Sequence, residues 1–374
     1  MSTLFLHIGT PKTGTTSLQQ FLFQNNKTLE TFGFSFPTFP LSFPNIRQQR
    51  NGRFLIARFF TQNDVRDYEK EHEIENTGYQ LLLEQLSRYD NVILSEESIW
   101  HACDHKENFW WNLDKILKKN GHNLKIIVYL RRQDLFVQSY WLHKVREQET
   151  LTFQEYISKK KYKFCHLDYY EHLENIAFYV GKENIIVRVY ENQQYEGNDH
   201  SIFSDFLHIL NIPMTEQFKV PSLLYNTSID PICAETKRLL NNMPEFSEKN
   251  YIWLNRLRDL SQDNKEAERF FVPSLFTKEE LDAFYCNFEE GNKKIAQEYL
   301  HRLDGNLFQE PFVYNDHHFR FSTSELITNC GHLFLLLDNE NIALKQEIMR
   351  LEKERSNLFF SIKTVKRLFK RLFK

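Results

Sequence analysis

A loop rich in glycine and hydroxyl side chains stands near the start of the chain and carries its clearest chemical signal. It covers residues 9–17 and has the sequence Gly-Thr-Pro-Lys-Thr-Gly-Thr-Thr-Ser. When such a loop precedes a helix, its backbone N–H groups form a cradle for an anionic phosphate, and the helix dipole assists them. The loop therefore predicts a site for a ligand that carries a phosphate.

The lysine of this loop is displaced from the position that a nucleoside triphosphatase requires. A Walker A loop has the pattern Gly-x-x-x-x-Gly-Lys-Ser/Thr. Here the spacing of Gly9 and Gly14 is kept, but Thr15 occupies the lysine position and Lys12 precedes the second glycine by two residues. From there its ammonium group is expected to meet the charge that develops on a leaving phosphate. The plainer alternative, a Gly/Thr-rich turn with a surface lysine, is disfavoured because strand, loop and helix follow in the required order.

The same loop resembles the 5'-phosphosulfate loop of the sulfotransferases that use 3'-phosphoadenosine-5'-phosphosulfate (PAPS). The resemblance covers residues 1–305 and implies transfer of a sulfuryl group from PAPS to a hydroxyl or amine, without a metal. It also implies that the donor is bound by seven neighbouring residues, namely Pro11, Lys12, Thr13, Gly14, Thr15, Thr16 and Ser17.

Further along the chain, the resemblance assigns three more residues to the donor. Arg131 follows an apolar segment and Ser139 stands eight residues later, which is similar to the family's pair for the nucleotide 3'-phosphate. An arginine offers a planar fork for a phosphate, and the serine adds a hydroxyl. Arg132 is an open alternative to Arg131. Tyr190 looks like a family tyrosine that lies near the adenine.

Transfer to a hydroxyl or amine needs a base that accepts the proton. Glu96 and Glu97 follow a short apolar run, and the sequence Ser-Glu-Glu-Ser around them resembles the base segment of carbohydrate sulfotransferases. Adjacent side chains of an extended segment point to opposite sides, so one of the two is expected to reach the acceptor, with Glu96 the first choice. The interval from Lys12 to Glu96 is longer than in many glycan sulfotransferases. His101 and His105 are alternatives, because soluble small-molecule sulfotransferases use a histidine.

These residues need a sheet to position them, and the hydrophobic pattern predicts one. Apolar runs typical of buried strands alternate with segments of helical period. Strands are expected at 4–8, 92–94, 124–130 and 184–190, and helices at 15–25, 64–88, 108–119, 134–148 and 203–210. This alternation predicts an α/β fold, a P-loop-type doubly wound parallel sheet flanked by helices, with ligands at the carboxyl edge of the strands. Residues 33–52 are expected to form an ordered loop.

Composition limits the remaining possibilities. With 374 residues, 41% hydrophobic and 15% aromatic, the chain has enough material for one large domain and an appendage. The five cysteines are scattered and never form a Cys-x-x-Cys pair, which argues against a disulfide framework and a zinc–cysteine cluster. The first residues show no signal-peptide pattern, so we expect a cytoplasmic protein, with peripheral binding to the inner face of the membrane as an option.

The hydrophobic pattern of the C-terminal residues predicts that the protein oligomerises. We expect a sulfotransferase domain over 1–305, a linker over 306–330 and a coiled coil with a basic amphipathic end over 331–374. A heptad seam has spacings of four and three at Leu337, Asn341, Leu344, Ile348, Leu351, Arg355, Leu358, Ile362, Val365, Phe369 and Leu372. Asn341 and Arg355 interrupt the seam and are expected to fix its register. The seam predicts a homo-oligomer.

The end of the tail is basic, with six lysines and arginines and no acid among residues 363–374, in a chain of formal net charge -3. As a helix this end is suited to an anionic membrane surface or to a plain coiled-coil terminus. Nucleic acid is not an expected partner, because the rest of the chain is acidic.

The favoured prediction is sulfation of a carbohydrate, surface glycan or other hydroxyl-bearing acceptor. Two alternatives stay open. One is a P-loop kinase with an altered loop, which requires a magnesium-binding carboxylate and a lysine at position 15. The other is a non-catalytic nucleotide-binding scaffold that oligomerises.

Overall fold

The computed structural model describes the chain from Met1 to Lys374 apart from seven gaps. The gaps are residues 45, 198, 222–228, 248–249, 268–273, 317–320 and 373–374, and the side chains of 247 and 356–372 also lie outside the description. The chain divides into two compact units. Unit 1 comprises residues 1–141, 151–227 and 273–318, and unit 2 comprises 142–150, 228–272 and 319–374. The sequence predicted domain boundaries after residues 305 and 330, which differ from the boundaries of these two units. The predicted domains stay a prediction.

Unit 1 is built on a parallel sheet. In the described part of the chain, five strands pair in the order β2-β3-β1-β4-β5, and every pairing is parallel. The strands are β1 (Thr3–His7), β2 (Phe34–Ser35), β3 (Asn91–Ser95), β4 (Asn123–Leu130) and β5 (Ile185–Val189). The predicted α/β class and the four predicted strands are confirmed. The short strand β2 is an addition, because the Phe- and Pro-rich segment that contains it shows no strand period.

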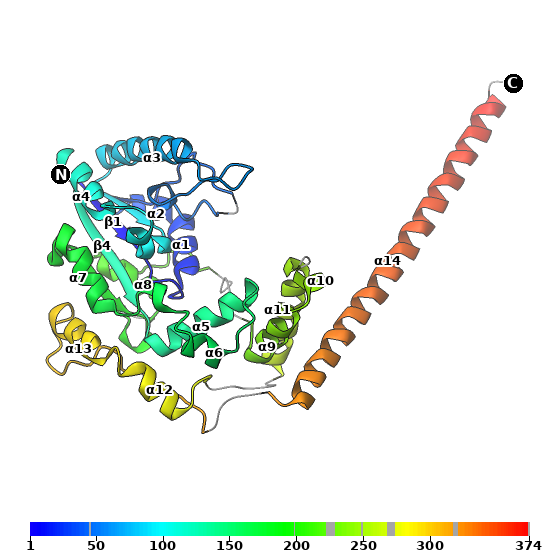
Figure 1. Cartoon of the computed structure of the whole chain (residues 1–374). Coiled ribbons are helices and arrows are strands. Elements are labelled where there is room, and N and C mark those ends of the chain that lie inside the picture. Colours follow the sequence, from blue (N-terminus) through cyan, green and yellow to red (C-terminus); the bar gives the residue numbers. More distant parts are fainter. Residues whose placement is uncertain are drawn as a thin grey trace. The chain divides into compact units, whose positions relative to one another are not determined.

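Helices connect the strands and extend the unit (Figure 1). They are α1 (Thr15–Gln24), α2 (Asn26–Glu30), α3 (Tyr68–Arg88), α4 (Phe109–Lys119), α5 (Gln133–Arg146), α6 (Phe153–Ser158), α7 (Tyr169–Val180), α8 (Ile202–Ile209), α12 (Lys278–Tyr285) and α13 (Glu289–Glu298). Short 3₁₀ helices are η1 (Arg53–Leu55), η2 (Glu97–Asp104), η3 (Lys163–Cys165), η4 (Lys182–Asn184) and η5 (Asn192–Gln194).

Both faces of the sheet are buried. On one face Phe21 of α1 and Phe206 of α8 pack with Ile127 of β4 in one hydrophobic cluster. Ile126 and Val128, which alternate with Ile127 and point to the other face, are also fully buried, and α4 packs against β4. Burial on both faces explains why the strands have continuous apolar runs. It leaves the carboxyl edge of the sheet for polar chemistry.

Unit 2 contains helices α9 (Pro231–Leu240), α10 (Pro244–Ser247), α11 (Asn250–Glu266) and α14 (Thr323–Leu372). A buried polar cluster joins three of them. Asn329 of α14 donates to the Thr236 hydroxyl at 3.0 Å, and Asn264 of α11 donates to Asn329 at 3.2 Å and to Asp230 at 3.0 Å. The first turns of α14 are therefore fixed within this unit.

The long helix α14 confirms that the tail is helical, and it begins eight residues before the predicted coiled coil. Between 341 and 355 every residue is exposed, and the seam residues Leu344 and Ile348 are 60% and 54% exposed. The seam side chains from 358 onward and the basic end lie outside the described side chains, so coiled-coil pairing and membrane binding stay predictions. Among the described residues, no helix combines the length and the apolar character needed to span a membrane.

Candidate active site

The loop between β1 and α1 lies at the centre of the carboxyl edge of the sheet. β1 is flanked by β3 on one side and β4 on the other, so the chain order reverses at this strand. Ligands of open α/β sheets bind at such a switch point. The backbone N–H of Thr10 donates to the carbonyl of Tyr129 at 2.9 Å, and the Thr13 hydroxyl donates to the carbonyl of Thr10. These bonds fix the loop against β4.

The predicted donor-binding residues lie together on this loop and the first turn of α1. Thr13, Thr15 and Ser17 are buried, whereas Pro11, Lys12, Gly14 and Thr16 are partly exposed. Helix α1 begins after Gly14, which supplies no capping side chain, and its first turn contains no acid. The partial positive charge of the helix N-terminus is therefore not countered by a carboxylate of that turn, which suits an anionic ligand.

Arg131 is held against this loop. It directly follows β4, and its Nη1 donates to the carbonyl of Lys12 at 2.8 Å. The Tyr190 ring, at the end of β5, lies 5.8 Å from the Arg131 guanidinium carbon. The Tyr190 hydroxyl is so close to Gly14 that a Cβ atom there would lie 3.2 Å from it. The structure therefore brings Lys12, Gly14, Arg131 and Tyr190 to one place. Ser139 lies within α5, partly buried, and has no hydrogen bond to Arg131.

The two neighbouring arginines differ in their partners. Burial lowers the pKa of Arg131, and no carboxylate among the described residues forms an ion pair with it. Arg132 is 1% exposed, binds both carboxylate oxygens of Asp134, at 2.7 and 3.2 Å, and lies 4.2 Å from the Phe312 ring centre. Arg132 is therefore committed to the packing of the fold, whereas Arg131 is a partly buried cation that an anionic ligand can pair with.

Glu96 is held by cations in the interior. It follows β3, its side chain is fully buried, and Arg50 forms two hydrogen bonds with its carboxylate, one of them at 3.0 Å. Arg53 lies 3.8 Å from the same carboxylate, and the Ser98 backbone N–H donates to it at 3.0 Å. This network holds the Glu96 carboxylate in place through several hydrogen bonds and ion pairs.

Glu97 also pairs with Arg50, whose Nη1 lies 3.4 Å from its carboxylate, but unlike Glu96 it contacts the loop and α1. A Cβ atom on Gly9 would lie 3.2 Å from the Glu97 Cβ, and Gln19 of α1 donates to the Glu97 carboxylate at 2.8 Å. Burial raises the pKa of Glu97, as does the charge of Glu96, whereas Arg50 and the bond from Gln19 oppose the rise. A carboxyl with a raised pKa beside the phosphate loop is suited to take up a proton.

A buried polar chain beneath the loop was not predicted from the sequence. His7 of β1 bonds through Nδ1 to the Ser95 hydroxyl at 2.8 Å, and Gln19 donates to the same hydroxyl at 3.3 Å and to Glu97. Burial lowers the pKa of His7 to about 3, so its ring is neutral. The signal in the sequence was a histidine within an apolar strand; its register position opposite Ser95 is known from the structure.

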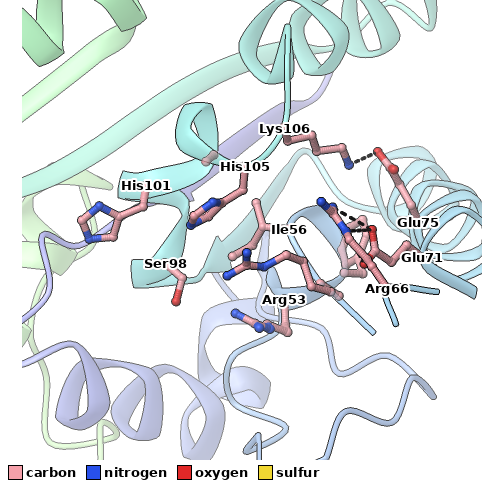
Figure 2. Close-up of a pocket in the computed structure, with 13 residues that line it drawn as sticks. Arg53, Ile56, Arg66, Glu71, Glu75, Ser98, His101, His105 and Lys106 are labelled. Carbon is pink, nitrogen blue, oxygen red and sulfur yellow. Dashed lines mark hydrogen bonds and ion pairs between the residues drawn. The ribbon is translucent and has the colours of Figure 1, made fainter. Parts of the chain in front are cut away.

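The alternative bases line a cavity of about 310 Å³ (Figure 2). Its wall is about equally polar and apolar, and its polar residues are Arg53, Arg58, Arg66, Glu71, Glu75, Ser98, His101, His105 and Lys106. Arg66 pairs with Glu71 at 2.9 Å and Lys106 with Glu75 at 2.5 Å. Burial lowers the pKa of His101 to about 4, and the nearby His166 adds to the shift.

Comparisons with known proteins leave the family open. No protein-family model matches the chain. An uncharacterized protein of Archaeoglobus fulgidus is 32% identical over 198 residues, and the match covers 50% of this chain, which spans only half of that relative. The crystal structure of a sulfotransferase from Alicyclobacillus acidocaldarius aligns with a TM-score of 0.35 and 16% identity, over 68% of this chain and 95% of that one. A TM-score of this size does not show a shared fold.

The buried His7 predicts a pH-dependent stability. Its folded pKa of about 3 lies below the ordinary value of 6.5, so the unfolded chain takes up the proton first and stability falls as the pH drops from 6.5 toward 3. His7→Asn removes this proton uptake. It should therefore reduce the slope of the unfolding free energy against pH by up to about 1.4 kcal/mol per pH unit, which corresponds to one proton. The measurement is chemical unfolding followed by tryptophan fluorescence between pH 4 and 7.

Ser95→Ala is the matched control for this prediction. It removes the hydrogen bond of His7 but keeps the histidine, so it should lower stability and retain the slope. A His7→Asn variant with the parent slope would show that His7 is not neutral in the fold.

Proposed function

We propose that this protein is a sulfotransferase that uses PAPS as its donor. The observation that carries the proposal is Arg131, a partly buried cation with no carboxylate partner among the described residues, which lies against the carbonyl of Lys12 in the loop between β1 and α1. The threonine at position 15 supports it, because the lysine of a triphosphatase loop is absent there.

In this proposal each donor group has its own residues. The backbone N–H groups of residues 9–17 and the Lys12 ammonium bind the 5'-phosphosulfate, with the N-terminus of α1 behind them. Arg131, with Ser139, binds the 3'-phosphate, and Tyr190 provides a ring surface beside it. This assignment uses the carboxyl ends of three adjacent strands, β1, β4 and β5.

PAPS supplies an activated sulfuryl group, whose sulfur–oxygen bond to the 5'-phosphate breaks as a new bond forms between sulfur and the acceptor oxygen. Lys12 balances the charge left on the phosphate. We assign the base to Glu97, which takes the proton from the acceptor hydroxyl, because it faces the loop and its pKa is raised. Glu96, the first choice from the sequence, is bound by Arg50 and is better suited to hold the segment in place.

The acceptor is proposed to be a carbohydrate or another molecule rich in hydroxyl groups. The cavity beside η2 supports this class because its wall contains both hydrogen-bond donors and acceptors, including Ser98, which directly follows Glu97. Arg53 belongs both to this wall and to the network around Glu96. Paired charges of both signs suit a polar, hydroxyl-bearing ligand better than an apolar one.

Replacement of the base tests the reaction. Glu97→Gln should lower kcat by roughly 10²–10⁴-fold, with donor affinity little changed, because only proton acceptance is removed. The parent rate should fall as the pH drops through the raised pKa of Glu97, and the variant should lose this dependence. Turnover is measured as release of 3'-phosphoadenosine-5'-phosphate from PAPS with a panel of carbohydrate acceptors.

Glu96→Gln is the matched control. It should lower stability, because it weakens the partner of Arg50, but it should keep kcat within about tenfold of the parent in the folded protein. If Glu96→Gln abolished turnover and Glu97→Gln kept it, the base would be Glu96. If Lys12→Ala retained the parent rate, the transfer mechanism itself would be contradicted.

We also propose that α14 pairs with α14 of a second copy of this chain. A helix of 50 residues spans about 75 Å, and over 341–355 it is fully exposed. A single helix of this length gains little from its own hydrogen bonds, whereas a heptad seam buries its apolar side chains on pairing.

Light scattering after size exclusion tests this pairing. The full chain should form a dimer or a higher oligomer, and the double variant Leu344→Asp/Ile348→Asp should shift it to the monomer because the charges fall within the seam. Met349→Asp is the control, since Met349 is equally exposed, at 63%, but lies outside the seam. A monomeric parent, or a parent mass in the double variant, would contradict the proposal.

A further inference from the structure

Two histidines and one carboxylate of unit 1 gather at one point away from the phosphate loop. His101 and Asp104 stand three residues apart on η2, and His166 directly follows η3. One ligand atom of each residue lies within 4.8 Å of those of the other two. Neither donor binding nor proton transfer by Glu97 requires this group, so it has no role in the proposed reaction.

The separations in this group fit a single metal ion. His166 Nε2 lies 2.8 and 2.9 Å from the two carboxylate oxygens of Asp104, and His101 Nδ1 lies 3.8 Å from one of them. Zinc holds nitrogen and oxygen ligands at about 2.0–2.2 Å, so tetrahedral ligand atoms stand about 3.4 Å apart. The observed distances lie on both sides of this value, so binding of an ion requires the three side chains to rotate toward it.

An ion pair between His166 and Asp104 does not account for His101. The Nδ1 atom of His101 is buried and has no hydrogen-bond partner among the described residues. Figure 2 shows its ring on the side away from Arg66 and Lys106 of the cavity. A buried nitrogen without a hydrogen-bond partner among the described residues, beside a carboxylate and a second imidazole, is suited to be a metal ligand.

The ring of His166 is supported from behind. It stacks on His172, with centroids 4.4 Å apart and an angle of 19° between the planes. The Nε2 of His172 in turn bonds to the carbonyl of Trp100 at 2.8 Å. Metal sites depend on such outer contacts, because these contacts hold the ligand rings in place before the ion arrives.

We propose that His101, Asp104 and His166 bind one divalent transition-metal ion, for which Zn²⁺ is well suited. Two imidazoles and one carboxylate are a frequent ligand set for such ions and leave further positions for water. A bound ion would connect η2, which begins at Glu97, to the segment after η3. The ion is then a clamp beside the cavity, and the inference does not depend on the proposed sulfuryl transfer.

The test is metal binding to the full chain. Calorimetric titration with ZnCl₂ should show one ion per chain, Co²⁺ should give a visible absorption band, and Zn²⁺ should raise the thermal unfolding temperature. Asp104→Asn and His166→Asn should each weaken Zn²⁺ binding by about 100-fold or more. Asparagine is chosen at 166 because it tolerates the left-handed backbone found there, with φ of 50°.

Two neighbours on η2 or next to it serve as matched controls. His105→Asn and Cys103→Ser should keep the parent affinity, since neither residue belongs to the group. Parent affinity in both ligand variants, or no binding at millimolar Zn²⁺, would overturn the proposal. Loss of binding in Cys103→Ser would likewise overturn it and assign the ion to the exposed thiol. Far-UV circular dichroism of each variant separates loss of the site from loss of the fold.

Discussion

The close approach of the loop backbone to its neighbours is the constraint on which the candidate site depends. At Gly9 and Gly14 a Cβ atom would lie about 3.2 Å from Glu97 and Tyr190 respectively, and both glycines have positive φ angles, 97° and 70°. Only glycine meets both demands at low cost. Any larger residue would push the loop away from β3 or β5. The positions of Glu97, the proposed base, and of Tyr190, the proposed nucleotide contact, therefore follow from the same narrow turn.

The charged side chains around this turn fall into two kinds. Some form ion pairs within the protein, and others are available to a ligand. Arg50 with Glu96, and Arg132 with Asp134, are pairs in which at least one side chain is fully buried. Removing one partner of such a pair leaves an uncompensated charge, so these pairs serve the fold. Arg131 has no carboxylate partner among the described residues, and only Glu97 of the two adjacent glutamates faces the loop. The unequal pairing of Arg131 and Arg132 is what makes this sheet edge a candidate binding site.

Much of this arrangement was predictable from the sequence, and the limits have physical causes. Strands β3 and β4 are buried on both faces, and β1 and β5 are short apolar runs, so all four are recognisable, and the spacing of Gly9 and Gly14 identifies the loop. The strand β2 was missed because it has only two residues. The choice between Glu96 and Glu97 as the proposed base depends on Arg50, which binds Glu96 and is 46 residues away from it in sequence. The polar chain from His7 to Gln19 depends on β1 and β3 lying side by side in register. Long-range contacts of this kind leave no local pattern.

Nucleotide binding tests the central claim most directly, because it depends on neither the acceptor nor the base. Calorimetry in the absence of magnesium should show that 3'-phosphoadenosine-5'-phosphate binds more tightly than ADP or ATP. Arg131→Ala should weaken that binding by roughly 10- to 200-fold, the worth of a hydrogen-bonded charge, whereas Arg58→Ala, which removes an exposed cation of the cavity, should not. A preference for ATP, or unchanged affinity in Arg131→Ala, would contradict the account.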